Sequence, residues 1–393
     1  MTRRRWREDP RLWSLGVPLA LVLLRLAEGV LVSQNQSTLM HLFGSSAPFP
    51  SAAHGPLVNL ERWDGAWYRG IARHGYASRA DAAFFPGYPL LARLVHEASL
   101  GLVGLDVALF ALSWGSLVVA APAFVRFASR RGLSPGLSLA ALVLLLFSPG
   151  SCFLVAWYPL SPYLLASLAA LSLLFARRRW GAALVAGAAS GLTPVGVALS
   201  LALALDALVR RRREPLAPRL AVSALGFWGV AAYALFCQWR YGSLLEPLAA
   251  QAGWSTRAAV PFGYLGPMVR TLLVGHLAPA VEAYFGLNVL CEVVALAVVV
   301  RLVVALVRGD ARGDHSTYAL FTIGSLVIPA SYVAPYGLTV KPIGFARLSG
   351  ASIGFDTELV RGARGRYALV AFGVIWLGAG LLGQILFCGG WFT

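Results

Sequence analysis

The stretch that decides the fold runs from Leu287 to Val307 and reads LNVLCEVVALAVVVRLVVALV. A helix needs about 20 predominantly apolar residues to cross the hydrocarbon core of a bilayer. Four further runs have a similar length and character: Leu12 to Val32, Leu100 to Val125, Val222 to Trp239 and Tyr367 to Phe387. Because backbone groups in lipid must be satisfied within their own segment, these runs predict transmembrane helices.

The composition agrees with a membrane protein. Of 393 residues, 58% are hydrophobic and only 13% are charged, whereas soluble domains carry about 25% charged residues. The net charge of +16 would suit a nucleic-acid partner, but the arginines stand in short clusters between apolar runs, as the positive-inside rule describes. We therefore expect membrane lipids and no nucleic acid as partners. The clusters occupy residues 3–7, 126–131, 177–179, 210–213, 308–312 and 361–366.

Placing these clusters in the cytoplasm predicts a topology. The chain is expected to be a single all-α, polytopic transmembrane bundle over residues 1–393, with about nine to eleven membrane segments. Residues 12–32 form its first helix, 33–99 a long outer loop with interfacial helices, and 100–393 the rest of the bundle. The N-terminus is then cytoplasmic. The bias toward Arg, Ala, Leu and Gly suggests a bacterial source, and hence the bacterial cytoplasmic membrane.

Two more membrane spans are expected, Leu137 to Ala156 and a short one near Phe345 to Leu359. The segment Trp180 to Val209 differs, because arginines stand at both of its ends and Gly191-Leu-Thr-Pro194 lies in its middle. A single span would place one arginine cluster outside, so the pattern favours a helical hairpin broken near Pro194.

The most specific part of the outer loop reads Arg62-Trp63-Asp64-Gly65-Ala66-Trp67-Tyr68. Trp63, Trp67, Ile71 and His74 follow helical spacing, which predicts a short amphipathic helix at headgroup depth. A carboxylate at this half-dry edge, Asp64, is a candidate functional group. The alternative is structural: Asp64 caps the helix or pairs with Arg62 or Arg69.

The order of motifs in this loop resembles the PIG-V family of mannosyltransferases. The likeness rests on Trp63-Asp64, on Ile71-Ala72-Arg73-His74-Gly75-Tyr76 and on Ala83-Phe84-Phe85-Pro86-Gly87-Tyr88-Pro89, with a weaker echo at Tyr158. The resemblance implies a GT-C-type glycosyltransferase with an active site on the outer face. It also implies a polyprenyl-phosphate sugar as donor, and Asp64 as the catalytic base.

The chemistry of such a transfer fits one carboxylate. Inverting transfer needs one base to take the proton of the acceptor hydroxyl. The leaving phosphate is already a stable anion, so the second carboxylic acid of an inverting glycosidase is not required. The phosphate instead needs fixed positive charge. We expect Lys341 and Arg347 to supply it, because each lies in or near an apolar stretch where an unpaired cation is costly.

The sequence therefore predicts a transferase that moves mannose or another hexose, with Asp64 as catalytic residue. No metal or cofactor is expected besides the lipid-linked sugar, since nothing with metal-ligand spacing surrounds His54 or His74. The oligomeric state is not predicted. The substrate-binding candidates are Arg62, Trp63, Trp67, Tyr68, His74, Tyr158, Lys341 and Arg347.

Two departures from the family pattern leave other functions open. Leu160 stands where relatives carry an acidic residue, and Thr193-Pro194 where they tend to have Thr-Arg. The first departure favours a scaffold that has lost catalysis and assists a glycosylation complex. The break at Pro194 favours a transporter or flippase of a lipid-linked substrate.

Overall fold

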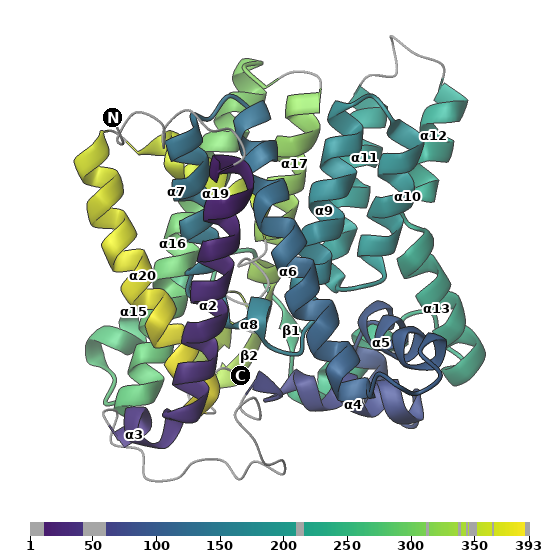
Figure 1. Ribbon diagram of the computed structural model, residues 1–393, viewed down its shortest axis with the longest axis horizontal. Coiled ribbons are helices and arrows are strands. Elements are labelled where there is room, and N and C mark those ends of the chain that lie inside the picture. The colour runs from purple at the N-terminus through teal and green to yellow at the C-terminus, as the bar shows by residue number, and fades with distance from the viewer. Residues whose placement is uncertain are drawn as a thin grey trace.

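The protein is an all-α membrane bundle with one small sheet (Figure 1), seen in a computed structural model. The structure describes residues 12–41, 60–209, 216–311, 314–336, 339–342, 345, 352–363 and 365–389. The helices are α2 (Val17–Gln34), α3 (Gln36–His41), α4 (Asp64–His74), α5 (Gly87–Ala98), α6 (Leu105–Arg130), α7 (Pro135–Leu146), α8 (Cys152–Val155), α9 (Leu160–Phe175), α10 (Arg179–Ser190), α11 (Val197–Val209), α12 (Leu216–Leu225), α13 (Trp228–Tyr241), α14 (Glu246–Ala250), α15 (Leu265–Val274), α16 (Pro279–Arg308), α17 (Asp314–Val327), α19 (Ile353–Gly362) and α20 (Arg366–Gly389).

The lengths of the helices confirm a polytopic membrane protein. Within the described ranges, four helical segments are long and apolar enough to span a bilayer alone: Leu12–Gln34, Leu105–Arg130, Pro279–Arg308 and Tyr367–Cys388. Three of them match an apolar run of the sequence to within about five residues at either end, and Pro279–Arg308 starts eight residues before the run Leu287 to Val307. Shorter apolar helices of 10–17 residues, such as Leu160–Phe175, pack among them. The total of nine to eleven membrane segments stays a prediction.

Two of the predicted spans are interrupted helices, and the interruption has the same cause in both. The run from Leu137 to Ala156 ends as a helix at Leu146, and α8 starts only at Cys152. Ser148-Pro149-Gly150 lies between them, and proline and glycine interrupt a helix even in apolar surroundings. The run from Val222 to Trp239 divides into α12 and α13, which meet at an angle of 61°, with Gly226 at the break. In this second case, α12 and α13 together are still long and apolar enough for one bent span.

The hairpin predicted near Pro194 is confirmed. Helices α10 and α11 are separated by a turn that contains the 3₁₀ segment Pro194–Gly196, and they lie side by side in the bundle (Figure 1). Gly196 allows the tight turn, because a Cβ there would stand 2.1 Å from the Ala189 carbonyl oxygen. The short span expected near Phe345 to Leu359 is wrong in its position, since α19 covers Ile353–Gly362.

The expected outer loop after α17 contains regular structure. Strands β1 (Arg257–Ala258), β2 (Tyr332–Tyr336) and β3 (Thr339–Pro342) form an antiparallel sheet in the order β1-β2-β3. Arg257 is opposite Val333, and Val333 is opposite Pro342. This small sheet joins two loops that are about 75 residues apart in the chain, and no local pattern in the sequence predicts that pairing.

The two ends of the bundle differ in character. Arg177 pairs with Asp314 at 3.3 Å, and Arg131 lies over the Tyr318 ring at 4.4 Å; both contacts lie at the end where α6 finishes. Asp106, in the first turn of α6, bonds α4 at the opposite end. Since α6 rises about 1.5 Å per residue over its 26 residues, these ends are roughly 39 Å apart, which exceeds the hydrocarbon thickness of about 30 Å. Figure 1 shows α4 and α5 lying across one end.

Candidate active site

Asp64 is the first residue of α4 and lies half-buried at the end of the bundle. The preceding residue, Trp63, has a φ of 63°, a left-handed conformation that a large side chain rarely adopts. It turns the chain sharply into the helix. A carboxylate in the first turn is stabilised by the unpaired N–H groups and the positive dipole end of the helix. The observed helix covers three of the four predicted positions, Trp67, Ile71 and His74, and starts one residue after the fourth, Trp63.

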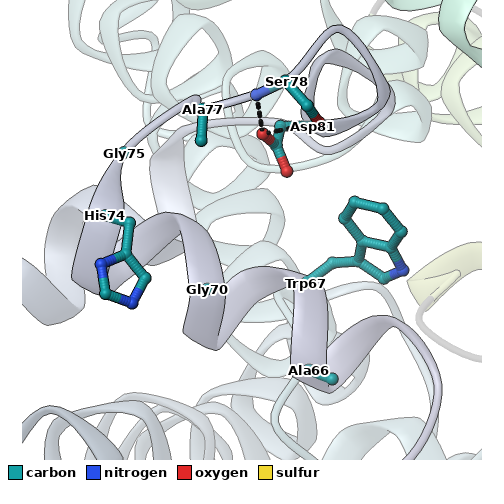
Figure 2. A pocket seen from close by; sticks show the side chains of 8 residues that line it. All are labelled: Ala66, Trp67, Gly70, His74, Gly75, Ala77, Ser78 and Asp81. Carbon is teal, nitrogen blue, oxygen red and sulfur yellow. Dashed lines mark hydrogen bonds between the residues drawn. The ribbon is translucent and has the colours of Figure 1, made fainter.

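The predicted aromatic stripe of α4 divides between two environments. Ile71 is only 4% exposed and packs inside the protein, and the placement of the helix at headgroup depth stays a prediction. Trp67 and His74 instead border a pocket of about 390 Å³ (Figure 2). His74 is exposed at the C-terminal end of α4. The lining residues are Ala66, Trp67, Gly70, His74, Gly75, Ala77, Ser78 and Asp81.

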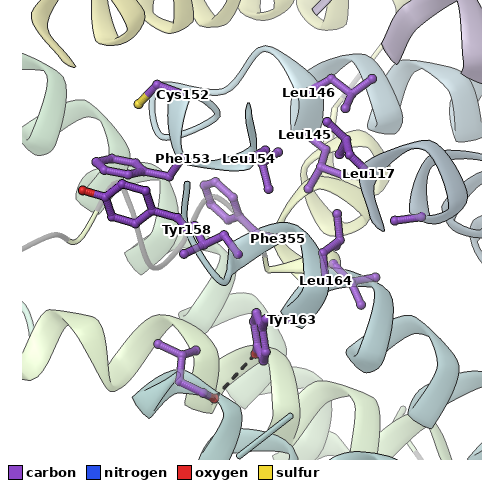
Figure 3. Packing of buried hydrophobic residues seen from close by; sticks show 14 of the residues in the cluster. Leu117, Leu145, Leu146, Cys152, Phe153, Leu154, Tyr158, Tyr163, Leu164 and Phe355 are labelled. Atoms are coloured by element: carbon purple, nitrogen blue, oxygen red, sulfur yellow. Dashed lines mark hydrogen bonds between the residues drawn. The ribbon is translucent and has the colours of Figure 1, made fainter. Parts of the chain in front are cut away.

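Tyr158 fixes the backbone around Asp64. Its hydroxyl accepts a hydrogen bond from the Asp64 backbone N–H at 2.9 Å and donates one to the Arg62 carbonyl oxygen at 3.0 Å. The ring is 1% exposed and packs against Phe153 with centroids 4.9 Å apart (Figure 3). The two bonds flank Trp63 on either side. Tyr158 therefore holds the strained turn from which Asp64 emerges, and the structure brings these two predicted residues together.

Tyr68 belongs to the buried core beneath α4. It is 6% exposed, and its ring makes edge-to-face contacts with Phe84, Tyr88 and Tyr158 at 5.5, 5.5 and 6.0 Å. Trp67 stacks on Phe84 with centroids 5.1 Å apart. Edge-to-face and stacked pairs fix aromatic rings more firmly than burial alone. The motif from Ala83 to Pro89 thus supports the motif around Asp64, because its residues Phe84 and Tyr88 pack beneath α4.

A network of charges holds α4 against α6. Arg69 donates to Glu61 at 2.8 Å and to both carboxylate oxygens of Asp106 at 2.9 and 2.7 Å, and Arg73 also bonds Asp106. The Arg69 guanidinium lies 5.7 Å from the centre of the Trp157 ring. The carboxylates that pair with Arg69 are therefore Glu61 and Asp106. Burial raises the pKa of Glu61 above its ordinary value, against the opposing effect of Arg69.

The motif from Ala83 to Pro89 and the preceding Ala82 are hydrogen-bonded through backbone atoms to residues much later in the chain. Tyr233 donates to the carbonyl oxygens of Ala82 and Phe84 at 2.8 and 3.1 Å. Gln251 donates to Ala83 at 3.2 Å. Gly87 donates its N–H to the Gly191 carbonyl oxygen at 2.9 Å, and a Cβ on Gly87 would lie 2.7 Å from that oxygen. This close approach explains the glycine of the motif.

The remaining predicted residues have mixed outcomes. Arg62 donates to Gln36 at 3.3 Å, and burial lowers the pKa of its guanidinium. Lys341 lies in β3, but its side chain is outside the described atoms, and Arg347 is outside the described residues. The phosphate-binding role of these two cations stays a prediction. Leu160, in the position of the missing acidic residue, is 2% exposed in the first turn of α9.

Sequence reasoning missed the supporting residues. Four polar residues support the site and lie outside the motifs: Glu61, Asp106, Tyr233 and Gln251. Glu61 directly precedes a motif, and the other three are far from any. Asp106 carried a usable signal, because a carboxylate in the first turn of a membrane helix calls for a cation nearby. In the part of the chain that the structure describes, no three His, Cys, Asp or Glu residues gather as a metal site.

Comparisons with known proteins agree with the motifs. Residues 16–216 match the family model described as mannosyltransferase (PIG-V). The chain is similar to GPI alpha-1,6-mannosyltransferase 2 of Mus musculus, with 32% identity over 163 residues that cover 38% of this chain and 33% of the relative. The protein of the same name from Cricetulus griseus is 28% identical over 166 residues, or 39% of this chain and 32% of the relative.

The matched region thus spans about a third of each curated relative. No solved structure matches the chain significantly. The region that matches the family model contains Asp64, the supporting rings of Phe84 and Tyr88, Tyr158 and the α10–α11 hairpin. Since the family model covers just over half of the chain, this multi-pass membrane protein belongs to the PIG-V mannosyltransferase family.

Proposed function

We propose that this protein transfers mannose from a polyprenyl-phosphate donor to an acceptor hydroxyl at the outer face of the membrane, with Asp64 as general base. The observation that carries the proposal is the placement of Asp64: half-buried at a helix N-terminus, on a backbone fixed by Tyr158, at one end of a membrane bundle. A carboxylate built into a rigid turn at headgroup depth is suited to chemistry on a lipid-borne substrate.

The orientation of the bundle supports the outer-face location. The arginine-rich end, with Arg131, Arg177 and Arg361, is the cytoplasmic end if the positive-inside rule holds. Asp64 then lies at the opposite, outer end. There the sugar and phosphate of a membrane-bound donor are at headgroup depth, while its prenyl chain stays in the hydrocarbon core.

The reaction would be a single displacement with inversion. The acceptor oxygen attacks C1 of the mannose while the bond from C1 to the phosphate oxygen breaks. Asp64 takes the proton of the attacking hydroxyl, and the phosphate leaves with the bonding electrons on the prenyl carrier. Cations near the leaving group stabilise the charge that it gains. Arg62, Lys341 and Arg347 are the residues we assign to this task.

The test is transfer by membranes that contain the full chain, supplied with radiolabelled polyprenyl-phosphate-mannose. Asp64→Asn keeps the size of the side chain and removes its basicity, so we expect loss of labelled product with normal expression. Glu97→Gln is a matched control, because Glu97 is an exposed carboxylate of the same outer region paired only with Arg93 within its own helix, as far as the described contacts go. Equal transfer by wild type and Asp64→Asn would sink the proposal.

A transporter would behave differently in the same preparation. Proteoliposomes would move a lipid-linked substrate across the bilayer without forming a new glycosidic bond, and Asp64→Asn would have no specific effect on product. A scaffold would give transfer only when a second glycosyltransferase co-purifies with it. Product formation by the purified chain alone separates the proposed enzyme from both.

A further inference from the structure

The pocket beside α4 is lined by residues that have no part in the proton transfer proposed for Asp64. Its volume of about 390 Å³ lies within the range of small-ligand pockets. One wall is α4, where Trp67, Gly70 and His74 follow at spacings of three and four residues and so share one face. The other wall is the turn from Gly75 to Asp81, which closes over the helix (Figure 2).

Asp81 is the built polar element of this pocket. The residue is 9% exposed, and one carboxylate oxygen accepts hydrogen bonds from the Ser78 N–H at 2.6 Å and the Ser78 hydroxyl at 3.0 Å. These two bonds fix the rotamer of the carboxylate. Figure 2 shows the carboxylate directed from the turn toward α4, with Trp67 on the facing wall. A fixed acceptor therefore lies across the pocket from an aromatic ring.

This pairing of groups suits a sugar ring. A hexose has one face of C–H groups, which packs on an aromatic ring, and an edge of hydroxyls, which donate to carboxylates. Trp67 provides the ring, held from behind by Phe84 at 5.1 Å. Asp81 provides the acceptor, and His74 a further polar group at the exposed end. A prenyl chain would leave the Asp81 carboxylate without a hydrogen-bonding partner from the ligand.

The pocket is also close to the proposed base. Trp67 follows Asp64 by three residues, or about 4.5 Å along the helix axis. We propose that this pocket binds a sugar residue of the acceptor, next to the hydroxyl that receives the mannose. That the bound sugar belongs to the acceptor rests on the proposed function. The binding of a glycoside to the pocket can be measured without any transfer.

Gly70 offers a direct way to close the pocket. It lines the pocket in mid-helix, and a Cβ there would meet nothing within 4 Å. Gly70→Phe therefore adds a ring to the wall of the pocket from a Cβ that contacts no neighbour. The matched control is Gly115→Phe, since Gly115 is an exposed helical glycine of α6 with equally open space. Asp81→Asn retains an acceptor for Ser78 but removes the charge.

The experiment is saturation-transfer NMR on the purified full chain in lipid nanodiscs, with methyl α-D-mannopyranoside and methyl α-D-glucosaminide as probes. Wild type, Gly115→Phe and Asp64→Asn should bind at least one probe saturably. Gly70→Phe should weaken that binding about tenfold or more, because the pocket is filled, and Asp81→Asn should weaken it as well.

Two results would overturn the inference: no saturable binding of either probe to the wild type, or equal binding by wild type and Gly70→Phe. The outcome is separate from that of the transfer assay. If Asp64→Asn abolishes transfer but Gly70→Phe binds as wild type does, only the sugar pocket is wrong. If the probes bind as expected but no mannose is transferred, the proposed reaction fails and the pocket stands as a glycoside site.

Discussion

Removing the Tyr158 hydroxyl tests whether the turn before α4 positions the base. Tyr158→Phe deletes one bond to the Asp64 N–H and one to the Arg62 carbonyl, each worth about 1 kcal/mol. These two bonds offset the cost of the left-handed backbone at Trp63, which is roughly 1–2 kcal/mol for a residue with a side chain. Without the bonds, the strained turn has little to hold it, and Asp64 leaves its position for much of the time.

A loss of about 2 kcal/mol in positioning corresponds to a fall in kcat of roughly 10- to 30-fold, since 1.36 kcal/mol is tenfold. KM for the donor should change little, because the ring of Tyr158 and its packing remain. The assay is mannosyl transfer by purified variants at saturating donor, with thermal unfolding measured in parallel.

The matched control is Tyr163→Phe, in the first turn of α9. Tyr163 is as deeply buried as Tyr158, but its hydroxyl faces the Val195 carbonyl oxygen at 3.5 Å and not the backbone beside Asp64. We expect it to retain near wild-type kcat. A wild-type kcat for Tyr158→Phe, beside an inactive Asp64→Asn, would refute the reasoning that the turn must be fixed for the base to act.

Three further changes should alter stability. Arg25 is fully buried and pairs with Glu28 at 2.6 Å, so Arg25→Ala should cost about 3 kcal/mol in thermal unfolding, and unchanged unfolding would contradict this. Arg69→Ala, which breaks bonds to two carboxylates, should cost about 1–2 kcal/mol, whereas the exposed Arg93→Ala should cost under about 0.5 kcal/mol. Because the folded state raises the pKa of Glu61, stability should fall as pH rises from the ordinary glutamate pKa through the raised one; Glu61→Gln should flatten that slope.

The sequence predicted the parts of the fold that depend on local pattern. Uninterrupted apolar runs of bilayer length became α2, α6, α16 and α20, because an apolar segment in lipid has no alternative to a helix. The short helix over Trp67, Ile71 and His74 followed from their spacing, although its start at Asp64 did not. The break before Pro194 followed from charge at both ends of one segment.

The end of α7 at Leu146 was missed although its cause is local, because Ser148-Pro149-Gly150 follows it inside an otherwise apolar run. The other features that the sequence did not predict depend on contacts between distant residues. The pairing of β1 with β2 joins distant loops, and no local pattern encodes it. In the site, Asp64 and Tyr158 were identified from motifs, but the bond between them joins residues 94 positions apart.

The bonds from Tyr233 and Gln251 to the segment Ala82 to Phe84 have a consequence for biosynthesis. This segment leaves the ribosome well before either residue is made. During that interval the carbonyl groups of Ala82, Ala83 and Phe84 have only water or lipid headgroups as partners. The site therefore matures late, once α13 and α14 have been inserted, although the family match ends at residue 216. A nascent chain stopped at that point would hold the motif and lack the residues that shape it.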